Sequence, residues 1–198
     1  EALRARFDVL DAGGDTTAWD EQAIGELVKR RAPTHVFALL GTTRARAARV
    51  ARAGGDASRE TYAIVDVGMT LMVLRACEAQ QPRPRFVYLS SISAGLGACG
   101  AYLEARTEVE AALEKSGVPY TIARPSFIVG ERDVPRASEK VGSVVADAAL
   151  GLLGALGARR LRDRYASMTG AELAAALVRL ALDPAWENRI ADAADLRA

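Results

Sequence analysis

The chain of 198 residues is 50% hydrophobic, which is enough for one domain with a sizeable core. Its 26 basic and 25 acidic residues leave a net charge of +1, so overall charge indicates no nucleic-acid or other polyanionic partner. Cys77 and Cys99 have neither metal-site nor redox-motif spacing and fit a reduced compartment. With no recognisable signal peptide, and with residues 141–157 too short to span a membrane, we expect a cytoplasmic protein without membrane contact.

Two strands and a helix are predicted at the start of the chain. Residues 7–10 are a short apolar run that predicts a strand, and residues 18–31 have helical periodicity. Residues 36–40 are an almost continuous apolar run, which is typical of a buried parallel strand. Gly41 and Thr42 end that run.

An arginine-rich segment follows. Arg44, Arg46, Arg49 and Arg52 lie in an alanine-rich stretch without an acidic residue. One interpretation is a patch that binds anions or nucleic acid, and the other is an arginine face exposed to solvent. Because no aromatic residue interleaves with the arginines and the rest of the chain is balanced in charge, we favour the solvent-exposed face and expect no nucleic-acid partner.

A long helix and a central strand are predicted next. Residues 58–80 carry an apolar stripe at helical spacing, which Asp66 interrupts; we expect its side chain to face the end of the sheet. Residues 86–89 are an apolar run that predicts a strand, and Ser90 and Ser91 end it.

A second helix and strand complete a strand–helix–strand unit. The helical pattern opens near Ala101 and stops at Gly117, in the manner of a left-handed cap. Residues 120–123 form the next apolar run. A linking helix of this length implies a parallel strand pair with a right-handed crossover.

The remaining elements continue the alternation. A glycine-punctuated apolar helix is predicted over residues 141–157, an extended segment over 165–169, an amphipathic helix over 170–182 and a last strand over 188–191. Strands that alternate with helices predict an α/β fold with a doubly wound parallel sheet.

Ser91, Tyr102 and Arg106 are the candidate residues for chemistry. Tyr102 and Arg106 are four residues apart on one helix and therefore share a face. Ser91 follows the carboxyl end of a strand, where open α/β sheets bind ligands. A cation beside a phenol favours the phenolate, so Tyr102 could act as a general acid or base while the Ser91 hydroxyl holds a substrate oxygen. Each piece alone also fits an ordinary helix surface or strand end, and a competing interpretation makes Arg106 a surface residue that pairs with Glu110.

A glycine pattern lies between the serines and the tyrosine. Gly95, Gly97 and Gly100 match the dinucleotide fingerprint G-x-G-x-x-G, between a predicted strand and a predicted helix. The acidic residue that should follow about 20 residues later is missing. We therefore favour a flexible loop of small residues that borders the substrate.

Taken together, these motifs resemble those of a known family. A serine pair, a tyrosine eleven residues later, a basic residue four further on, an ExE sequence and the stretch SGVPYTIARPSFIVGER resemble the atypical short-chain dehydrogenase/reductase superfamily. The sequence LGTT at residues 40–43 is similar to its NmrA-like and Tat-interacting-protein-like branch of NAD(P)H-binding Rossmann proteins. The resemblance runs from about residue 7 to residue 196. It departs from the family pattern at Arg106, where the family has lysine, and in lacking the amino-terminal glycine-rich dinucleotide loop.

The resemblance implies a Rossmann-like fold with NADP or NAD as cofactor. Residues 7–10 would be the third strand and residues 36–40 the fourth, so we expect a single NAD(P)-binding domain that is truncated at its amino terminus. The helices that begin near residues 58 and 101 are the usual dimer faces of the family, which implies a possible homodimer.

The resemblance also implies an oxidoreductase or epimerase-like reaction on a small molecule. Tyr102 would be the acid or base, Ser91 would hold the carbonyl or hydroxyl, and Arg106 would replace the lysine that favours tyrosinate and contacts the nicotinamide ribose. The alternative is a non-catalytic NAD(P)H-sensing regulatory or protein-binding module, because arginine effectively never gives up its proton. The residues that would border the cofactor are Asp11, Gly41, Thr42, Ser90, Tyr102, Arg106, Arg124, Pro125, Ser126, Phe127 and Ile128.

Overall fold

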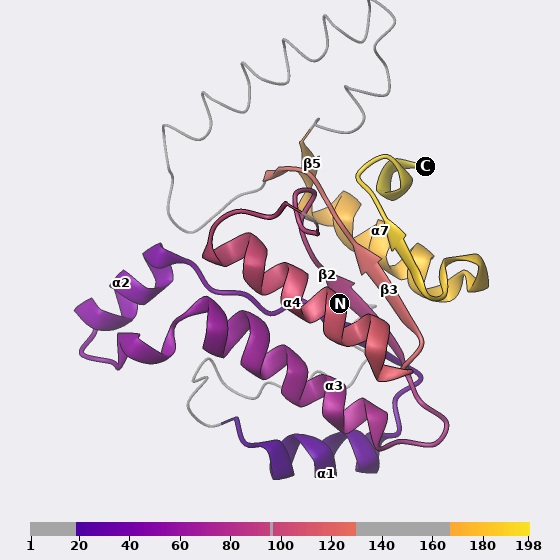
Figure 1. Ribbon diagram of the computed structural model, residues 1–198, viewed down its shortest axis with the longest axis horizontal. Helices are drawn as coiled ribbons and strands as arrows, with labels where there is room; N and C mark the ends of the chain where they lie inside the picture. Colours follow the sequence, from indigo (N-terminus) through magenta and orange to yellow (C-terminus); the bar gives the residue numbers. More distant parts are fainter. Residues whose placement is uncertain (1–18, 96, 130–166) are drawn as a thin grey trace, which may run out of the picture.

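The computed structural model describes residues 19–95, 97–129 and 167–198 (Figure 1). The strand predicted over residues 7–10, Asp11 and the helix predicted over residues 141–157 lie outside the described residues. A parallel sheet has the strand order β1-β2-β3-β6, and β4 pairs with β5 in a separate two-stranded sheet. The strands are β1 His35–Ala38, β2 Arg85–Leu89, β3 Tyr120–Ala123, β4 Ile128–Val129, β5 Met168–Thr169 and β6 Arg189–Ala191.

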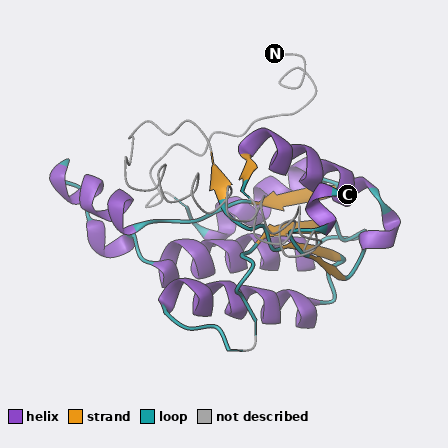
Figure 2. Ribbon diagram, turned by 90° about the horizontal axis from the view of Figure 1, so that it is seen from above, coloured by secondary structure: helices purple, strands orange, loops and turns teal. Residues whose placement is uncertain are grey.

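Helices cover both faces of the four-stranded sheet (Figure 2). One face packs against α1 Glu21–Arg31, α3 Thr70–Glu78 and α4 Ala101–Ser116, and the other packs against α7 Gly170–Leu182. Successive residues of a strand point to opposite faces. Phe86 and Tyr88 therefore join the core under α4, whereas Val87 joins the core under α7. The predicted doubly wound parallel sheet is confirmed.

The strand–helix–strand unit at the centre agrees with the sequence. β2 and β3 are parallel neighbours, and α4 ends at Ser116 before Gly117, whose φ of 68° is in the left-handed region. The predicted helix over residues 170–182 is also confirmed, and Thr169 and Glu172 form a capping box at its start.

The single helix predicted over residues 58–80 is wrong at its amino-terminal end. The segment is divided into a short 3₁₀ helix η3 Ala57–Arg59, a π-helix η4 Tyr62–Met69 and then α3. Thr61 is extended between the first two, and its hydroxyl accepts a hydrogen bond of 3.2 Å from the Ile64 N–H. A side-chain cap within the segment starts a new helix, which the hydrophobic stripe could not reveal.

The arginine-rich segment is a regular helix, α2 Arg44–Arg52. Thr43 caps it by accepting the N–H of Arg46 at 3.1 Å, and none of its residues is buried. It extends away from the sheet (Figure 1), and the predicted solvent-exposed face is confirmed for Arg44, Arg49 and Arg52, whereas Arg46 is partly buried and pairs with Glu60.

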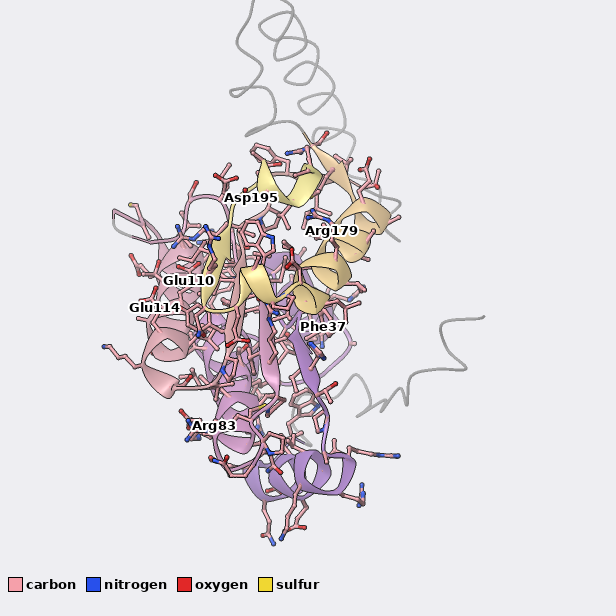
Figure 3. The ribbon with its side chains drawn as sticks, turned by 90° about the vertical axis from the view of Figure 1, so that its right-hand side faces the viewer. Phe37, Arg83, Glu110, Glu114, Arg179 and Asp195 are labelled. Carbon is pink, nitrogen blue, oxygen red and sulfur yellow. The ribbon has the colours of Figure 1, made fainter. Side chains whose placement is uncertain are left out.

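Two basic side chains join the amino end of the sheet to α7. His35 Nε2 donates to the Ala181 carbonyl at 3.0 Å, and Arg85 donates to the Asp183 carbonyl at 2.9 Å. These contacts satisfy carbonyl groups at the end of α7, which have no partner within the helix. His35 therefore has a structural role. Phe37 is partly exposed on the side of the sheet away from Glu110 of α4 (Figure 3).

No helix in the parts of the chain that the structure describes is both long and apolar enough to cross a membrane.

The two thiols should differ sharply in reactivity. Cys77 belongs to α3 and is fully buried, whereas Cys99 is exposed. Burial, with a smaller contribution from Glu78, raises the pKa of the Cys77 thiol to about 12. Because only the thiolate reacts, a thiol reagent at mildly alkaline pH should modify one cysteine in the folded protein and both in denaturant. Cys99→Ser should remove the fast reaction; rapid modification of both thiols in the folded protein would contradict this core packing.

Candidate active site

Arg106 lies at the centre of the candidate site, where β1 and β2 end. Its guanidinium Nη1 donates to the carbonyls of Leu40 at 3.2 Å and Leu89 at 3.0 Å, and to the Tyr88 hydroxyl at 3.2 Å. The side chain is only 8% exposed. Arg106 therefore connects α4 to the carboxyl ends of two neighbouring strands, the edge at which open α/β sheets bind ligands.

Asp66 of η4 is the charge partner of Arg106. Its Oδ1 lies 2.8 Å from Arg106 Nη2, and its Oδ2 accepts the Thr42 N–H at 2.9 Å. Burial raises the pKa of the Asp66 carboxyl, against the opposing effects of the Thr42 N–H and of Arg106. Burial also disfavours the Arg106 cation, but the phenols of Tyr88 and Tyr102 and the Asp66 carboxylate outweigh it and raise the pKa of the guanidinium. Asp66 faces the sheet end, as the sequence predicted.

The interpretation of Arg106 as a surface residue paired with Glu110 is wrong. Arg106 is 6% exposed and pairs with Asp66, while Glu110 binds Arg124 through contacts of 2.9 and 2.6 Å. The side chains of Arg106 and Glu110 lie on one helix, but the sheet and η4 supply better-placed partners for each.

Tyr102 lies over the guanidinium at the surface of the site. Its ring centroid is 5.1 Å from Arg106 Cζ and 5.6 Å from the Tyr62 ring, and the residue is 37% exposed. Among the described residues no hydrogen bond joins the Tyr102 hydroxyl to Arg106. The cation therefore lies against the ring face of this phenol, and the residue as a whole is partly exposed.

Gly41 and Thr42 bring the end of β1 against the ion pair. A Cβ at Gly41 would lie 2.8 Å from Arg106 Nη2, so only glycine allows this close approach. Thr42 is buried, and its hydroxyl donates to Glu60 Oε2 at 2.9 Å. The same Glu60 oxygen accepts Arg46 Nε at 2.8 Å, which connects the exposed helix α2 to the site.

Ser90 and Ser91 follow β2, as predicted. Ser90 is buried, its N–H donates to the Ala123 carbonyl at 2.8 Å, and its hydroxyl has no hydrogen-bond partner among the described residues. Ser91 is half-buried, and its carbonyl accepts the Ala94 N–H at 3.0 Å. Ser91 thus begins the loop that leads to Tyr102.

The residues after β3 differ in what they present to the site. Pro125 and Ser126 are buried; the Pro125 carbonyl accepts the Ile92 N–H at 3.0 Å, and Ser126 Oγ accepts Arg197 Nη2 at 3.2 Å. Phe127 is 68% exposed and Ile128, at the start of β4, is 38% exposed. Of this group, Phe127 and Ile128 have the most surface available to a bound molecule.

The glycine pattern does not have the contacts of a phosphate loop. Gly95 N–H donates to Thr107 Oγ1 at 2.9 Å, and Gly100 N–H donates to Glu104 Oε1 at 3.2 Å. In a dinucleotide loop the helix amino terminus receives a phosphate. Here a carboxylate of the helix itself takes that position, which supports the interpretation as a loop of small residues.

Sequence reasoning missed Tyr88, Glu60 and the Glu110–Arg124 pair. Tyr88 had a usable signal: it precedes Ser90 by two residues, so the strand period places both on the side of α4. Glu60 and Glu110 had no comparable signal, because charged residues in helical segments usually face solvent.

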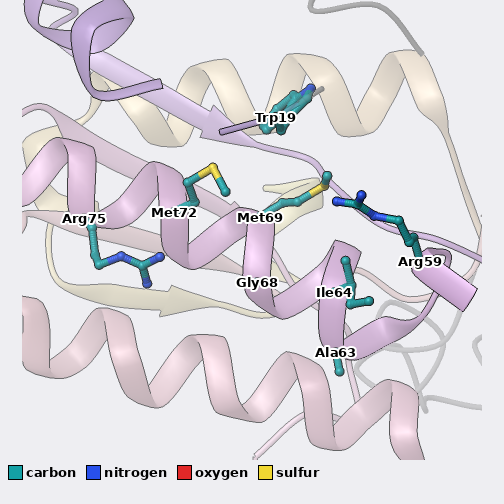
Figure 4. Close-up of a pocket in the computed structure, with 8 residues that line it drawn as sticks. All are labelled: Trp19, Arg59, Ala63, Ile64, Gly68, Met69, Met72 and Arg75. Carbon is teal, nitrogen blue, oxygen red and sulfur yellow. The ribbon is translucent and has the colours of Figure 1, made fainter. Parts of the chain in front are cut away.

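A separate hollow of about 330 Å³ lies between the start of α1 and the segment formed by η4 and α3 (Figure 4). Arg75 at one end already pairs with Glu21. The candidate site residues do not line this hollow, which is formed by Trp19, Arg59, Ala63, Ile64, Gly68, Met69, Met72 and Arg75.

Comparisons with known proteins give structural neighbours only. No protein-family model and no curated protein sequence matches the chain. The UDP-glucose 4-epimerase of Thermotoga maritima, solved with UDP-glucose, has a TM-score of 0.54 and 18% identity over 86% of this chain and 58% of its own. The NAD complex of the Thermus thermophilus UDP-glucose 4-epimerase has a TM-score of 0.51 and 14% identity over 90% of this chain and 64% of its own.

A third neighbour is the terminal R domain of the myxalamid biosynthetic pathway, with a TM-score of 0.57 and 15% identity over 96% of this chain and 50% of its own. The chain therefore spans about half to two-thirds of the length of these proteins. At such low identity the likeness concerns the fold. The chain has the Rossmann-like parallel α/β fold that these epimerases share.

Proposed function

We propose that the chain belongs to an NAD(P)-binding protein of the atypical short-chain dehydrogenase type, in its NmrA-like branch. The proposed activity is an oxidoreductase or epimerase-like reaction on a small molecule. The observation that carries the proposal is the placement of Tyr102 over the buried Arg106 at the carboxyl ends of β1 and β2.

The residues at this edge fit a nicotinamide cofactor. Two buried polar atoms, Ser90 Oγ and Arg106 Nε, have no hydrogen-bond partner among the described residues. Phe127 and Tyr102 present partly exposed aromatic rings. When bound, the cofactor would supply or accept a hydride.

The chain's own groups would move the proton. Tyr102 would donate or accept it at the phenolic oxygen, and the Ser91 hydroxyl would hold the reacting carbonyl or hydroxyl group. Arg106 would hold the Tyr102 ring in place through contact with its face and would not exchange a proton, because its guanidinium stays charged.

One observation favours a second candidate, a non-catalytic NAD(P)H-sensing module. The Nη groups of Arg106 contact Asp66, Tyr88 and the carbonyls of Leu40 and Leu89 at the strand ends. The proton relay of the family lysine needs a cation that can release a proton, and the guanidinium of Arg106 cannot do this. Titration of NADH and NADPH, followed by nicotinamide fluorescence, tests both candidates. Oxidation of the bound cofactor across a panel of aldehydes, ketones and quinones separates them, and failure to bind either dinucleotide would contradict both.

Tyr102→Phe should reduce turnover by roughly 10²–10⁴-fold, the usual contribution of a general acid or base. The ring contacts with Tyr62 and Arg106 remain, so the melting temperature should change little. Tyr120→Phe is the matched control, because Tyr120 is the first residue of β3 and therefore lies at the amino end of the sheet, away from the candidate site. The turnover of this variant should equal that of the wild type. Full activity of Tyr102→Phe would remove Tyr102 from the mechanism.

The Arg106 variants separate charge from geometry. Arg106→Lys keeps the cation but loses the planar fork, so we expect a lower melting temperature with turnover within a factor of about ten, or about 1.4 kcal/mol. Arg106→Ala leaves the buried Asp66 carboxylate unpaired and should destabilise the fold by about 3–5 kcal/mol.

The stability that is lost in Arg106→Ala should also depend on pH. The pKa of the Asp66 carboxyl is already raised by burial, and losing the cation raises it further. The loss in free energy of unfolding should therefore be complete at pH values above that raised pKa. It should shrink at acid pH, where the carboxyl is protonated. Denaturant unfolding at several pH values measures it, with Asp66→Asn/Arg106→Ala as the control that should lack this dependence; a penalty equal at all pH values would exclude an unpaired Asp66 charge.

A further inference from the structure

The glycine loop, residues 92–95 and 97–100, connects Ser91 to the helix that carries Tyr102. We infer that Arg124 and Glu110 are positioning residues that anchor this loop at Gly95 and so fix Ser91 and Tyr102 relative to each other. The consequence for turnover rests on the proposed function; the anchoring itself does not.

The first step is the geometry of the ion pair. Arg124 Nε and Nη2 donate to the two carboxylate oxygens of Glu110 at 2.9 and 2.6 Å, and the Glu110 side chain is 5% exposed. A bidentate pair of this kind fixes the plane of the guanidinium. The hydrogen bonds to Glu110 raise the pKa of Arg124 despite partial burial, so the guanidinium stays charged.

The second step is the fit of Gly95 against that plane. A Cβ at Gly95 would lie 3.0 Å from Arg124 Nη2 and 3.5 Å from both Cζ and Nη1. These similar distances place the loop backbone against the guanidinium, so closely that a methyl group at Gly95 would require Arg124 to shift. The Gly95 N–H meanwhile donates to Thr107 Oγ1 of α4 at 2.9 Å.

The third step is that the anchoring is local. A Cβ at Gly97 or Gly100 would have nothing within 4 Å, although both residues, like Gly95, have positive φ. Gly95 is therefore held between α4 and the end of β3, whereas Gly97 faces open space.

These contacts assign Arg124 an indirect role. Its guanidinium is directed at Glu110 and Gly95, so it acts through the loop and α4 rather than on a reactant. Glu110 lies one helical turn after Arg106, on the helix that carries Tyr102. One ion pair thus connects the end of β3, the loop and the helix with the candidate acid or base.

The test compares Gly95→Ala with Gly97→Ala. Both replace a glycine of positive φ, at 108° and 84°, so the backbone strain is similar, but only the first places a methyl group against Arg124. For the measurement, a fluorophore is attached to Cys99, which is exposed on the same loop. Cys77 is buried and is therefore not expected to react with the label. Because a released loop lets the label on Cys99 rotate more freely, the fluorescence anisotropy of this label should fall in Gly95→Ala. In Gly97→Ala it should stay at the wild-type value. Equal anisotropy in the two variants would overturn the inference.

Arg124→Lys provides a second variant if Gly95→Ala does not fold. Lysine keeps a charge near Glu110 but lacks the planar fork, so anisotropy should again fall. Turnover should drop by roughly 10²-fold, as expected for misplaced reacting groups, with the pH profile of turnover unchanged. Wild-type anisotropy in Arg124→Lys would also overturn the inference. If the wild type binds no dinucleotide, the proposed function fails, and the anisotropy comparison still decides the anchoring.

Discussion

The buried ion pair of Asp66 and Arg106 is the interaction on which the candidate site depends. Removing one partner would leave an unpaired charge inside the protein, so each holds the other in place. Asp66 also accepts the Thr42 N–H, and Arg106 donates to carbonyls at the ends of β1 and β2. The pair therefore determines where η4, α4 and two strand ends meet, and Tyr102 rests on it.

The helix α4 is joined to its surroundings by two ion pairs one turn apart, of which the first is buried and the second partly buried. Arg106 reaches toward η4 and the strand ends, and Glu110 reaches Arg124 at the end of β3. Both contacts cross between elements that are distant in sequence. They orient the start of α4, where Tyr102 lies, more strictly than hydrophobic packing alone would, because ion pairs and hydrogen bonds are directional.

The same geometry explains why two functions are compatible with one site. Tyr102 presents a partly exposed phenol at the carboxyl ends of the strands, which is compatible with the proposed acid–base chemistry. The Nη groups of the Arg106 cation are also held by contacts within the protein, which suits a rigid binding surface.

The sequence by itself determined the α/β class, the parallel β2–β3 pair, the extent of α4 and α7 and the position of Ser91 at a strand end. These follow from local signals: apolar runs, helical spacing, capping residues and a glycine stop. It also indicated that Asp66 faces the sheet. Only the tertiary structure decided which charges pair. Spacing along α4 allowed Arg106 to pair with Glu110, but a charge that leaves water needs a well-placed opposite charge, and those partners, Asp66 and Arg124, come from elements that only the fold brings together. The division of the segment before α3 was decided in the same way, because a hydrophobic stripe shows which face is buried but not where a side-chain cap starts a new helix.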